Sequence, residues 1–379
     1  MKLKLLLCLA TVAVVNYACS PKYEKEGVII DGDKAVDVWF EDVATDVRVV
    51  PLVSDNPLED FVKVEMYGNE MIAMNSTQQR VYYFKDNVLQ GVLDAVGRGH
   101  GEYITLGEML YDQDRKILYV TQLNDRKEIL KYSVPDMKYI GSLHAPLSIG
   151  TMRIFDSKTF LLSTKDENQQ CGLVLFDIES EKIVKEVCQL NSYQYEQSPN
   201  ALSCFNKKNH LISLFGTTNR LCNFSNNSDS LEIIFSFNYG AKAADFVYQA
   251  PVNTDKEVDE LLKYLNQNGG TYANFYYPRK LKNGVSFWYS TLERRKKNYR
   301  FYRIEKDTEI NYKGFHISGL STLIYPTCIC ENGYATIISG IADKILVPEE
   351  TQSPLAKKIL EAISSQNDNN PIIVYYDIK

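Results

Sequence analysis

Short stretches of alternating apolar and polar residues, separated by turns, run through most of the chain and predict β-strands. The first four stretches occupy residues 61–66, 71–75, 80–84 and 88–95. The next four follow at nearly the same spacing and occupy residues 104–111, 117–122, 128–132 and 139–144. A recurring unit of four short strands predicts a β-propeller, which is a ring of four-stranded blades.

The same unit can be followed to the C-terminus. The third unit occupies residues 151–155, 159–163, 172–177 and 183–188. The fourth occupies residues 201–206, 210–215, 220–224 and 231–237, and the fifth 275–280, 284–292, 299–305 and 309–316. The sixth begins with residues 323–331, 334–339 and 342–347, and then lacks an outer strand until residues 371–378. We therefore predict an all-β, six-bladed propeller, since blades of roughly fifty residues are typical of this architecture.

Two stretches interrupt the strand pattern with helical spacing. Residues 254–267 and 353–364 each place apolar side chains on one face, and Thr254 and Ser353 are expected to cap them. The apolar residues are Val258, Leu261, Leu262 and Leu265 in the first stretch, and Leu355, Ile359, Leu360 and Ile363 in the second. Both are expected to be helical insertions that project from blade loops.

A ring of blades must also be closed, because its two ends would otherwise expose unpaired strand edges. Residues 37–40 and 46–52 precede the first full unit, and residues 371–378 end the chain. These runs are the candidates for a last blade that combines strands from both termini.

The first twenty residues resemble an export signal. Lys2 and Lys4 form a basic start, residues 5–15 are apolar but too few to span a bilayer comfortably, and Ala18 precedes Cys19. We predict a lipoprotein signal peptide at residues 1–18, acylation of Cys19, a tether at residues 19–35 and the propeller at residues 36–379. An ordinary signal peptide cleaved elsewhere is the alternative, because the residues at positions 16 and 17 depart from the usual lipoprotein pattern.

Composition narrows the class of protein further. The chain has 42 lysines and arginines against 48 aspartates and glutamates, a formal net charge of −6, which disfavours nonspecific nucleic-acid binding. Its 26 tyrosines and 16 phenylalanines suit the pleated surfaces of sheets. Its four histidines are scattered without ligand spacing, so we expect neither a metal site nor a cofactor.

Six cysteines remain after the signal peptide and Cys19 are set aside. Export permits disulfides, and Cys171 with Cys188, or Cys204 with Cys222, could each link strands of one blade. Cys328 and Cys330 alternate on a predicted strand and are expected to be buried thiols.

A glycine-rich heptad, residues 97–103, joins the first two units and consists of Gly97, Arg98, Gly99, His100, Gly101, Glu102 and Tyr103. A phosphate-binding loop would open a helix after a strand, whereas strands are predicted on both sides of this heptad. We predict an inter-blade turn whose glycines take positive φ, with Glu102 and Tyr103 fixing the start of the next strand. Arg98 and His100 could line a ligand mouth.

Aromatic residues supply the other candidates for binding. Tyr193 and Tyr195 lie in a polar connection, where exposed tyrosine can stack on a sugar ring or a peptide side chain. No catalytic motif is present, and carboxylate pairs such as Asp112 and Asp114 are typical of solvated turns.

Four segments taken together resemble a known family: residues 46–52, 79–84, the heptad and residues 370–379. The chain is similar over most of its mature length to the six-bladed, TolB-like β-propeller lipoproteins of Bacteroides-type bacteria. His100 stands where that family usually has proline. The resemblance implies a propeller fold and an exported, lipid-anchored location in the cell envelope, at the outer membrane, either periplasmic or surface-exposed. It implies no biochemical activity.

These observations favour a binding or scaffolding module for a glycan, a peptide or an envelope protein. We expect a monomer that contacts the membrane only through its acyl anchor and has no catalytic residues. The alternative is a carbohydrate-active hydrolase or lyase that uses the central funnel, which would need two acid–base groups brought together across blades.

Overall fold

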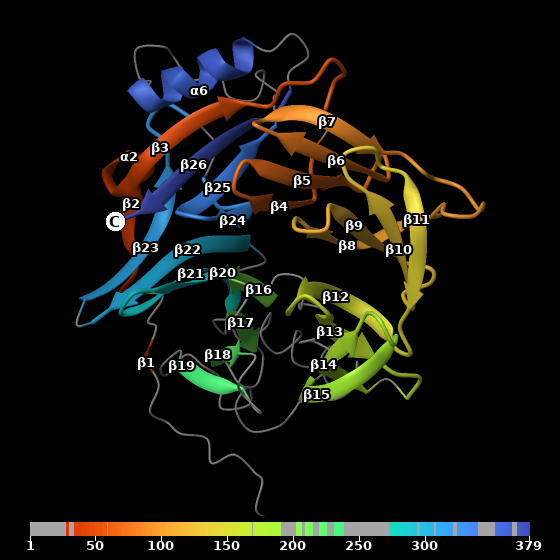
Figure 1. The fold of residues 1–379 in the computed structure, drawn as a ribbon. Helices are drawn as coiled ribbons and strands as arrows, with labels where there is room; N and C mark the ends of the chain where they lie inside the picture. Colours follow the sequence, from red (N-terminus) through yellow and green to blue (C-terminus); the bar gives the residue numbers. More distant parts are fainter. Residues whose placement is uncertain are drawn as a thin grey trace, which may run out of the picture.

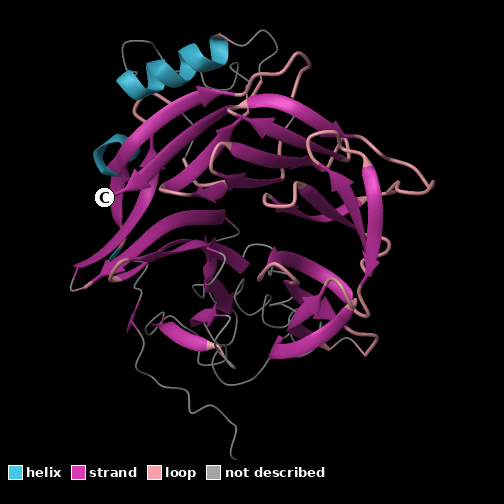
Figure 2. Cartoon of the chain, viewed as in Figure 1, coloured by secondary structure: helices cyan, strands magenta, loops and turns pink. Residues whose placement is uncertain are grey.

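A computed structural model gives the fold (Figure 1). The residues that it describes are 28–29, 34–58, 60–168, 170–190, 202–206, 209–214, 220–225, 231–238, 273–293, 296–306, 308–320, 324–339, 353–365 and 370–379. Within these ranges the chain is built mostly of strands, which are magenta in Figure 2. The helices α2 and α6, labelled in Figure 1, lie at one side of the ring.

The described strands form six sheets, arranged as blades around a central axis (Figure 1). Blade 1 contains β4 (Lys63–Tyr67), β5 (Glu70–Asn75), β6 (Arg80–Lys85) and β7 (Val88–Leu93). Blade 2 contains β8 (Leu106–Asp112), β9 (Ile117–Gln122), β10 (Glu128–Ser133) and β11 (Tyr139–His144). Blade 3 contains β12 (Ser148–Ile154), β13 (Thr159–Lys165), β14 (Cys171–Asp177) and β15 (Lys182–Leu190). The predicted strands of these three units all overlap observed strands, which confirms the repeat.

The second half of the ring follows the same order. Blade 4 contains β16 (Leu202–Asn206), β17 (Asn209–Leu214), β18 (Arg220–Ser225) and β19 (Glu232–Asn238). Blade 5 contains β20 (Ala273–Leu281), β21 (Gly284–Glu293), β22 (Lys296–Glu305) and β23 (Thr308–His316). Blade 6 contains β24 (Cys328–Cys330), β25 (Gly333–Ile338), β26 (Ile372–Ile378) and β3 (Ala44–Pro51).

The first strand of each blade lies nearest the axis. We call these six the axial strands: β4, β8, β12, β16, β20 and β24. Neighbouring axial strands approach one another, with β24 beside both β20 and β4, and β12 beside both β8 and β16. Side chains on the axial strands of different blades can therefore meet although they are far apart in the sequence.

Blade 6 closes the ring with strands from both ends of the chain, as predicted. The C-terminal β26 pairs with β25 on one side and with the N-terminal β3 on the other, with Val50 opposite Ile373. β26 thus takes the place that the sequence had assigned to residues 342–347, which lie outside the described residues. The shared blade joins the beginning and the end of the ring in one sheet.

The N-terminal segment also crosses two other blades. β1 (Val28–Ile29) pairs in parallel with β19 of blade 4, and β2 (Val36–Trp39) pairs in parallel with β23 of blade 5. The run at residues 37–40 was a candidate for the closing blade, and it instead extends blade 5 and leads into α2 (Phe40–Val43). Residues 28–51 therefore supply the outermost strand of three successive blades.

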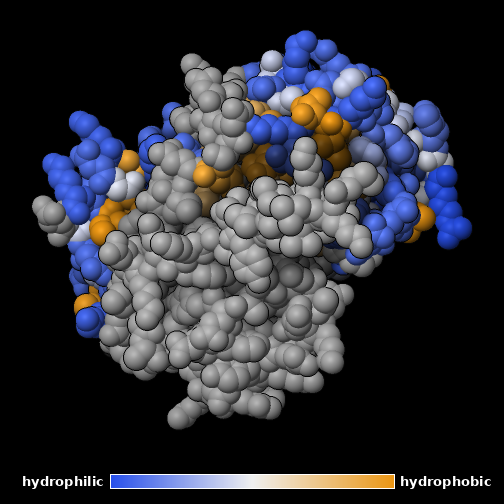
Figure 3. All heavy atoms as spheres, turned by 90° about the horizontal axis from the view of Figure 1, so that it is seen from below, coloured by the Kyte–Doolittle hydropathy of each residue, from blue (hydrophilic) through white to orange (hydrophobic). Residues whose placement is uncertain are grey.

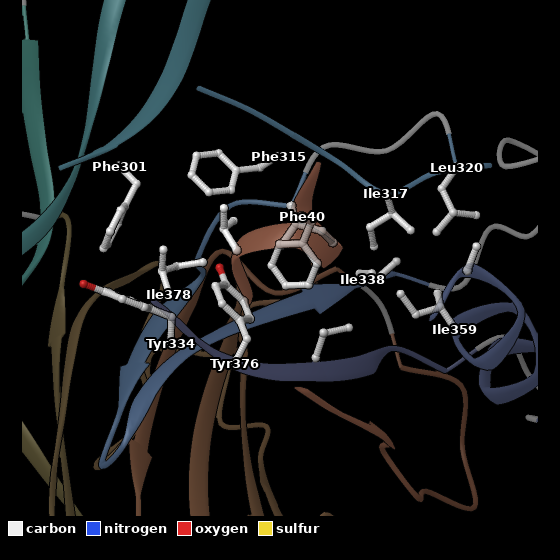
Figure 4. Packing of buried hydrophobic residues seen from close by; sticks show 14 of the residues in the cluster. Phe40, Phe301, Phe315, Ile317, Leu320, Tyr334, Ile338, Ile359, Tyr376 and Ile378 are labelled. Carbon is white, nitrogen blue, oxygen red and sulfur yellow. The ribbon is translucent and has the colours of Figure 1, made fainter. Parts of the chain in front are cut away.

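Apolar clusters fill the spaces between neighbouring blades. In the cluster between blades 5 and 6, Phe301 and Phe315 face Tyr334 and Tyr376, and Phe40 from α2 packs edge-on against Tyr376 (Figure 4). The alternation of each strand places one set of its side chains in these clusters. Seen from below, hydrophilic residues surround smaller exposed apolar areas (Figure 3).

The helix α6 (Pro354–Ser364) confirms the second predicted insertion. Ser353 is its N-cap, and its Oγ accepts a hydrogen bond from the Ala356 N–H at 3.1 Å. Ala356, Ile359 and Ile363 are fully buried in the cluster between blades 5 and 6. The first predicted insertion, at residues 254–267, lies outside the described residues. Within the described part of the chain, no helix has the length and apolarity needed to cross a membrane.

The strand register does not place either of the two cysteine pairs that the sequence allows directly opposite each other. Cys171 lies opposite Leu190, while Cys188 lies opposite Leu173. They are thus diagonal neighbours and not a directly opposed pair. Cys204 lies on β16 and Cys222 on β18, and β17 runs between these strands, which separates the two backbones by two strand spacings. Cys328 is buried as predicted, and Cys330 is partly buried.

Candidate functional site

Four charged side chains from three axial strands meet near the propeller axis. Lys63 and Glu65 come from β4, Glu108 from β8 and Arg153 from β12, and we call them the axial charge cluster. Lys63 and Glu65 are two residues apart, so the pleat of β4 places them on one face while Val64 between them enters the apolar cluster between blades 6 and 1. One face of β4 thus contributes to the apolar core and the other face contributes to the axial charge cluster.

Lys63 lies between the two carboxylates of the cluster. Its Nζ contacts the Glu108 carboxylate directly, lies 3.2 Å from Glu65 Oε1 and donates a hydrogen bond to the Met109 carbonyl at 2.9 Å. The Glu108 backbone N–H is satisfied separately by Thr121 Oγ1 at 2.8 Å. The ammonium group therefore joins blade 1 to blade 2.

Arg153 brings blade 3 into the same network. Its Nη1 lies 3.4 Å from Glu108 Oε1 and 3.6 Å from Glu65 Oε1, and it donates to the Met152 carbonyl at 2.7 Å. Glu65 also accepts a hydrogen bond from the Tyr67 hydroxyl at 2.6 Å. Each carboxylate is thus shared by two cations from different blades.

Burial changes the protonation chemistry of the cluster. The side chains of Lys63, Glu65, Glu108 and Arg153 are 15, 14, 6 and 13 % exposed, so they are largely shielded but still reachable. Burial lowers the pKa of Lys63 to about 8, although the nearby Glu65 charge opposes this. Burial alone would raise the pKa of Glu65, but the charges of Lys63 and Arg153 outweigh it and leave that pKa below its usual value.

The protonation states in the axial charge cluster disfavour glycoside hydrolysis and allow anion binding or base catalysis. Glu65 stays ionised at neutral pH, whereas the general acid of a glycoside hydrolase needs a raised pKa. Lys63 can lose its proton near pH 8 and can therefore either bind an anion or act as a base. The cluster as a whole offers donors and acceptors to a polar ligand.

A group of tyrosines lies where blades 5 and 6 meet. Tyr276 and Tyr277 belong to β20, Tyr299 belongs to β22, and Tyr325 precedes β24; we call them the tyrosine cluster. The rings of Tyr299 and Tyr325 stack in parallel, with centroids 4.4 Å apart and planes 4° apart. Tyr325 remains 42 % exposed. Burial raises the pKa of Tyr299 to about 12, so its phenol is neutral at physiological pH.

Backbone geometry sets the position of Tyr277. The β20–β21 register shifts between Tyr276 and Arg279, and Tyr277 within this irregularity has a φ of 52°. A left-handed conformation is unusual for an aromatic residue and persists only where the surrounding structure holds it. The irregularity interrupts the strict alternation of β20, and the adjacent Tyr276 and Tyr277 have their ring centroids 6.3 Å apart.

The structure places Arg98 and His100 at the outer rim of the propeller. Both side chains are exposed, and the His100 ring packs edge-on against Tyr139, with centroids 4.8 Å apart. Tyr139 lies on β11, the outermost strand of blade 2. These two residues are therefore not brought together with the axial charge cluster, and their role in ligand binding stays a prediction. Tyr193, Tyr195 and Cys19 lie outside the described residues.

The heptad forms the turn between blades 1 and 2 that its sequence predicts. The Gly97 N–H donates to the Tyr103 carbonyl at 2.9 Å, and the Gly99 N–H donates to Glu102 Oε2 at 2.6 Å. The buried Tyr103 hydroxyl donates to the Gln79 carbonyl at 2.7 Å, which attaches the turn to blade 1. Glu102 and Tyr103 therefore fix the turn.

The predicted positive φ is correct only for Gly101, which has a φ of 76°. Gly97 and Gly99 lie outside the left-handed region, and a Cβ at either would crowd the Glu102 carboxylate. These two glycines are explained by close packing of the Glu102 side chain and not by backbone handedness. At Gly101 both reasons apply, because a Cβ there would collide with the Tyr139 ring.

Gly101→Ala is expected to destabilise the protein more than Gly68→Ala. Both glycines have positive φ, which costs an alanine roughly 1–2 kcal/mol, but a Cβ on Gly68 has open space around it. The collision with Tyr139 should add about 1–3 kcal/mol. Chemical denaturation of the two variants measures the difference, and equal losses would contradict the role given to Tyr139.

The axial charge cluster was missed by sequence reasoning. Its members fall at isolated positions in three separate units, and none forms a short motif. One pattern in the sequence could have indicated the cluster. The first strand of each of three successive units carries at least one charged residue among apolar ones: Lys63, Glu65, Glu108 and Arg153.

Comparisons with known proteins agree with this architecture. A crystal structure of a candidate exported protein from Bacteroides fragilis has a TM-score of 0.69 and 15 % identity, covering 91 % of this chain and 98 % of that one. Two other solved structures have TM-scores below 0.5 and carry no argument about the fold. They are the Cps50 (Swd1) domain of Myceliophteria thermophila, at 0.35 with 12 % identity over 72 % of this chain and 70 % of that one, and BamB from Moraxella catarrhalis, at 0.38 with 8 % identity over 70 % and 75 %.

No curated protein matches the sequence significantly. The family model DUF5128, described as a 6-bladed β-propeller, matches residues 20–318, which is most of the chain. The chain belongs to this family of six-bladed β-propellers.

Proposed function

We propose that this chain is an exported, lipid-anchored binding module that recognises its ligand at the axial charge cluster. The cluster is the observation that carries the proposal. It brings two cations and two carboxylates from three blades to side-chain exposures of 6–15 %. Removing such charges from water costs free energy that apolar packing would not, so a buried ionic cluster is weak support for stability and a reasonable marker of a site.

Apolar side chains pack between neighbouring blades around the propeller, and single ion pairs also join blades, such as Arg279 with Asp377 and Lys116 with Glu70. Apolar side chains fill the interface between blades 5 and 6, and also that between blades 2 and 3. The axial charge cluster interrupts this mode of packing where blades 1, 2 and 3 approach the axis. A ligand with polar groups could use the hydrogen-bonding positions that the cluster leaves at its exposed side.

Export and anchoring rest on the N-terminal sequence. Cys19 follows the apolar segment and is the proposed site of acylation, with the outer membrane as the destination and either a periplasmic or a surface-exposed position. The B. fragilis neighbour, a candidate exported protein with the same fold, supports the compartment. Metabolic labelling with a palmitate analogue tests this, because the native chain should take up label and Cys19→Ser should not.

A second candidate function is catalysis at the same place. Lys63, with its pKa near 8, is the observation that favours it, since a lyase needs a base that is partly deprotonated near neutral pH. The ionised Glu65 disfavours a hydrolase of the usual two-carboxylate kind. We favour binding, because both carboxylates of the cluster are already shared by Lys63 and Arg153.

The chain starting after Lys25, applied to an array of glycans, peptides and peptidoglycan fragments, is expected to bind at least one class without forming product. Arg80→Ala is the matched control, because it removes a charge from an exposed ion pair between Arg80 on β6 and Asp94, which follows β7. Product formation would overturn the binding proposal and favour the lyase. Retained binding in an Arg153→Met variant that is still folded would exclude the axial charge cluster as the site.

A further inference from the structure

The apolar interface between blades 3 and 4 contains cysteines from both blades. Cys171 and Cys188 come from β14 and β15 of blade 3, and Cys222 comes from β18 of blade 4. The two blades lie side by side at the bottom of Figure 1. Cys222 is 1 % exposed, and Cys188 is partly buried. A covalent bond within this cluster would join two neighbouring blades.

The ring of Phe224 shows how β18 is aligned against blade 3. The Phe155 ring stacks on it with centroids 5.0 Å apart, and Lys185 Nζ lies 5.6 Å from its centroid. Lys185 lies opposite Leu175 in the register of β14 and β15, and Leu175 belongs to the same apolar cluster. Phe224 therefore packs against blade 3 at the level of the pair formed by Leu175 and Lys185.

The next level along these strands brings Cys188 and Cys222 to the same place. On β14, Leu173 is two residues before Leu175, and Cys188 lies opposite Leu173. On β18, Cys222 is two residues before Phe224, so the pleat points both side chains into the interface. β14 and β18 are the third strands of neighbouring blades and run in the same direction around the ring. The same two-residue step therefore leads to Cys188 in one blade and to Cys222 in the other.

The pairings within a single blade fit a disulfide less well. Cys171 and Cys188 are diagonal neighbours, whose backbones are about 7–8 Å apart, beyond the usual span of a disulfide. Cys204 and Cys222 are separated by β17, a distance of about 9–10 Å. The charge on Cys222, in contrast, acts directly on Cys188 across the interface.

We propose that Cys188 and Cys222 form a disulfide that joins blade 3 to blade 4. The inference rests on the export part of the proposed function, because disulfides persist in an oxidising compartment. The bond would restrict the unfolded chain by closing the loop from residue 188 to residue 222. It would thus stabilise the ring at an interface remote from the closing blade.

The bond is made by thiol–disulfide exchange with a disulfide-bonded thiol oxidoreductase. The thiolate of one cysteine attacks a sulfur of the oxidoreductase, which gives a mixed disulfide and releases the other sulfur as a thiolate. The thiolate of the second cysteine then attacks the sulfur of the first, which forms the bond between Cys188 and Cys222 and releases the oxidoreductase as a dithiol. Two electrons and two protons pass from the chain to the oxidoreductase.

The exchange is expected to take place while the chain folds. Burial, with a smaller contribution from the charge of Cys222, raises the pKa of the Cys188 thiol to about 12. The reactive thiolate of Cys188 is therefore scarce once blades 3 and 4 have packed together.

The test is mapping of linked peptides without reduction. The chain starting after Lys25 is unfolded, reduced and refolded with reduced and oxidised glutathione, which takes the place of the oxidoreductase. Trypsin alone leaves Cys188 and Cys204 in one peptide, residues 186–207, so a glutamate-specific protease is added to cleave after Glu196.

We expect the peptide of residues 187–196, which holds Cys188, to be joined to residues 221–232, which hold Cys222. A link from Cys222 to Cys171 or to Cys204 would overturn the proposal, as would the absence of any link to Cys222.

Thermal unfolding of the oxidised and the reduced forms measures the effect of the bond. The oxidised parent should unfold about 3–5 °C above the reduced parent. Cys222→Ala should show no such difference, and Cys330→Ala, which alters a cysteine of blade 6, should keep it. Each variant is compared with itself, so a loss of packing does not affect the result. A difference that persists in Cys222→Ala would overturn the proposal.

The outcomes in the native bacterium separate the inference from the export on which it rests. The chain is isolated after its thiols have been blocked at lysis, and palmitate labelling at Cys19 is measured in parallel. Labelled chain in which Cys188 and Cys222 are both reduced would overturn the inference and leave the exported binding module standing. Unlabelled chain with both cysteines reduced would overturn both.

Discussion

A chain that lacks residues 370–379 is expected to lose the cooperative unfolding transition of the propeller. This segment contains β26, whose removal would separate β25 from β3 and open blade 6 on both sides. Ile372, Ile373 and Val374 are fully buried, and Tyr376 is 2 % exposed, so the interfaces with blades 5 and 1 would lose their apolar contents together. At about 2–5 kcal/mol for each large apolar side chain removed, the sum exceeds the whole stability of most domains.

Thermal unfolding followed by circular dichroism measures this effect. The matched control is a chain starting at residue 28, which removes the proposed signal peptide and part of the proposed tether but keeps β1, β2 and β3. We expect the control to unfold cooperatively at the temperature of the parent. A cooperative transition in the chain without β26 would show that five blades and an open sixth suffice.

Glu108→Leu is expected to destabilise the protein by about 3–5 kcal/mol, as found when one partner of a buried ion pair is removed. Its carboxylate is 6 % exposed and contacts both Lys63 and Arg153, so both cations would lose a counter-charge at once. Glu65 would remain as the single carboxylate of the cluster for two cations. Denaturant unfolding of the variant and the parent gives the difference in free energy of unfolding.

The double variant Lys63→Met/Glu108→Leu tests whether unbalanced charge causes the loss of stability expected for Glu108→Leu. It leaves one cation, Arg153, opposite one carboxylate, Glu65, so much of the lost stability should return. Arg80→Ala serves as the surface control and should change stability by less than about 1 kcal/mol. If the double variant were as unstable as the sum of its single variants, the loss would reflect packing and not unbalanced charge.

The blades could be predicted from the sequence because their signal is local. In blades 1 to 3 the outer strands alternate, the inner ones are short apolar runs, and the observed strands fall within a few residues of the expected ones. The start of α6 at Ser353 could be predicted for the same reason, since an N-cap followed by apolar residues at helical spacing is a local pattern. Local chemistry is enough where neighbours in the sequence are neighbours in space.

The axial charge cluster could not be predicted in this way. Lys63 and Glu108 are 45 residues apart, and only the curvature of the ring brings their strands together. An isolated lysine or glutamate on a strand reads as solvent-facing, because alternation alone does not tell the outer surface of a blade from its axial side. The cysteines show a related limit, because strand order and register, and not spacing in the sequence, decide which cysteines are opposed.

The heptad shows an intermediate case. Its position between blades and the roles of Glu102 and Tyr103 follow from composition, but the reason for Gly97 and Gly99 is the folded-back carboxylate of Glu102. Arg98 and His100, which stood out in the sequence, lie by the outermost strand of blade 2. The glycine-rich motif thus marks a turn with tight packing, whereas the residues of the axial charge cluster form no recognisable sequence motif.

The closing blade also governs when this protein can fold. Thr45 Oγ1 donates to the Asp377 carbonyl at 3.5 Å, and these residues are 332 positions apart, so β3 leaves the ribosome long before its partner exists. β26 is synthesised after β3 and completes the ring. A chain exported as proposed could therefore thread through a translocation pore with its ring still open, and would reach its stable form only after β26 had crossed.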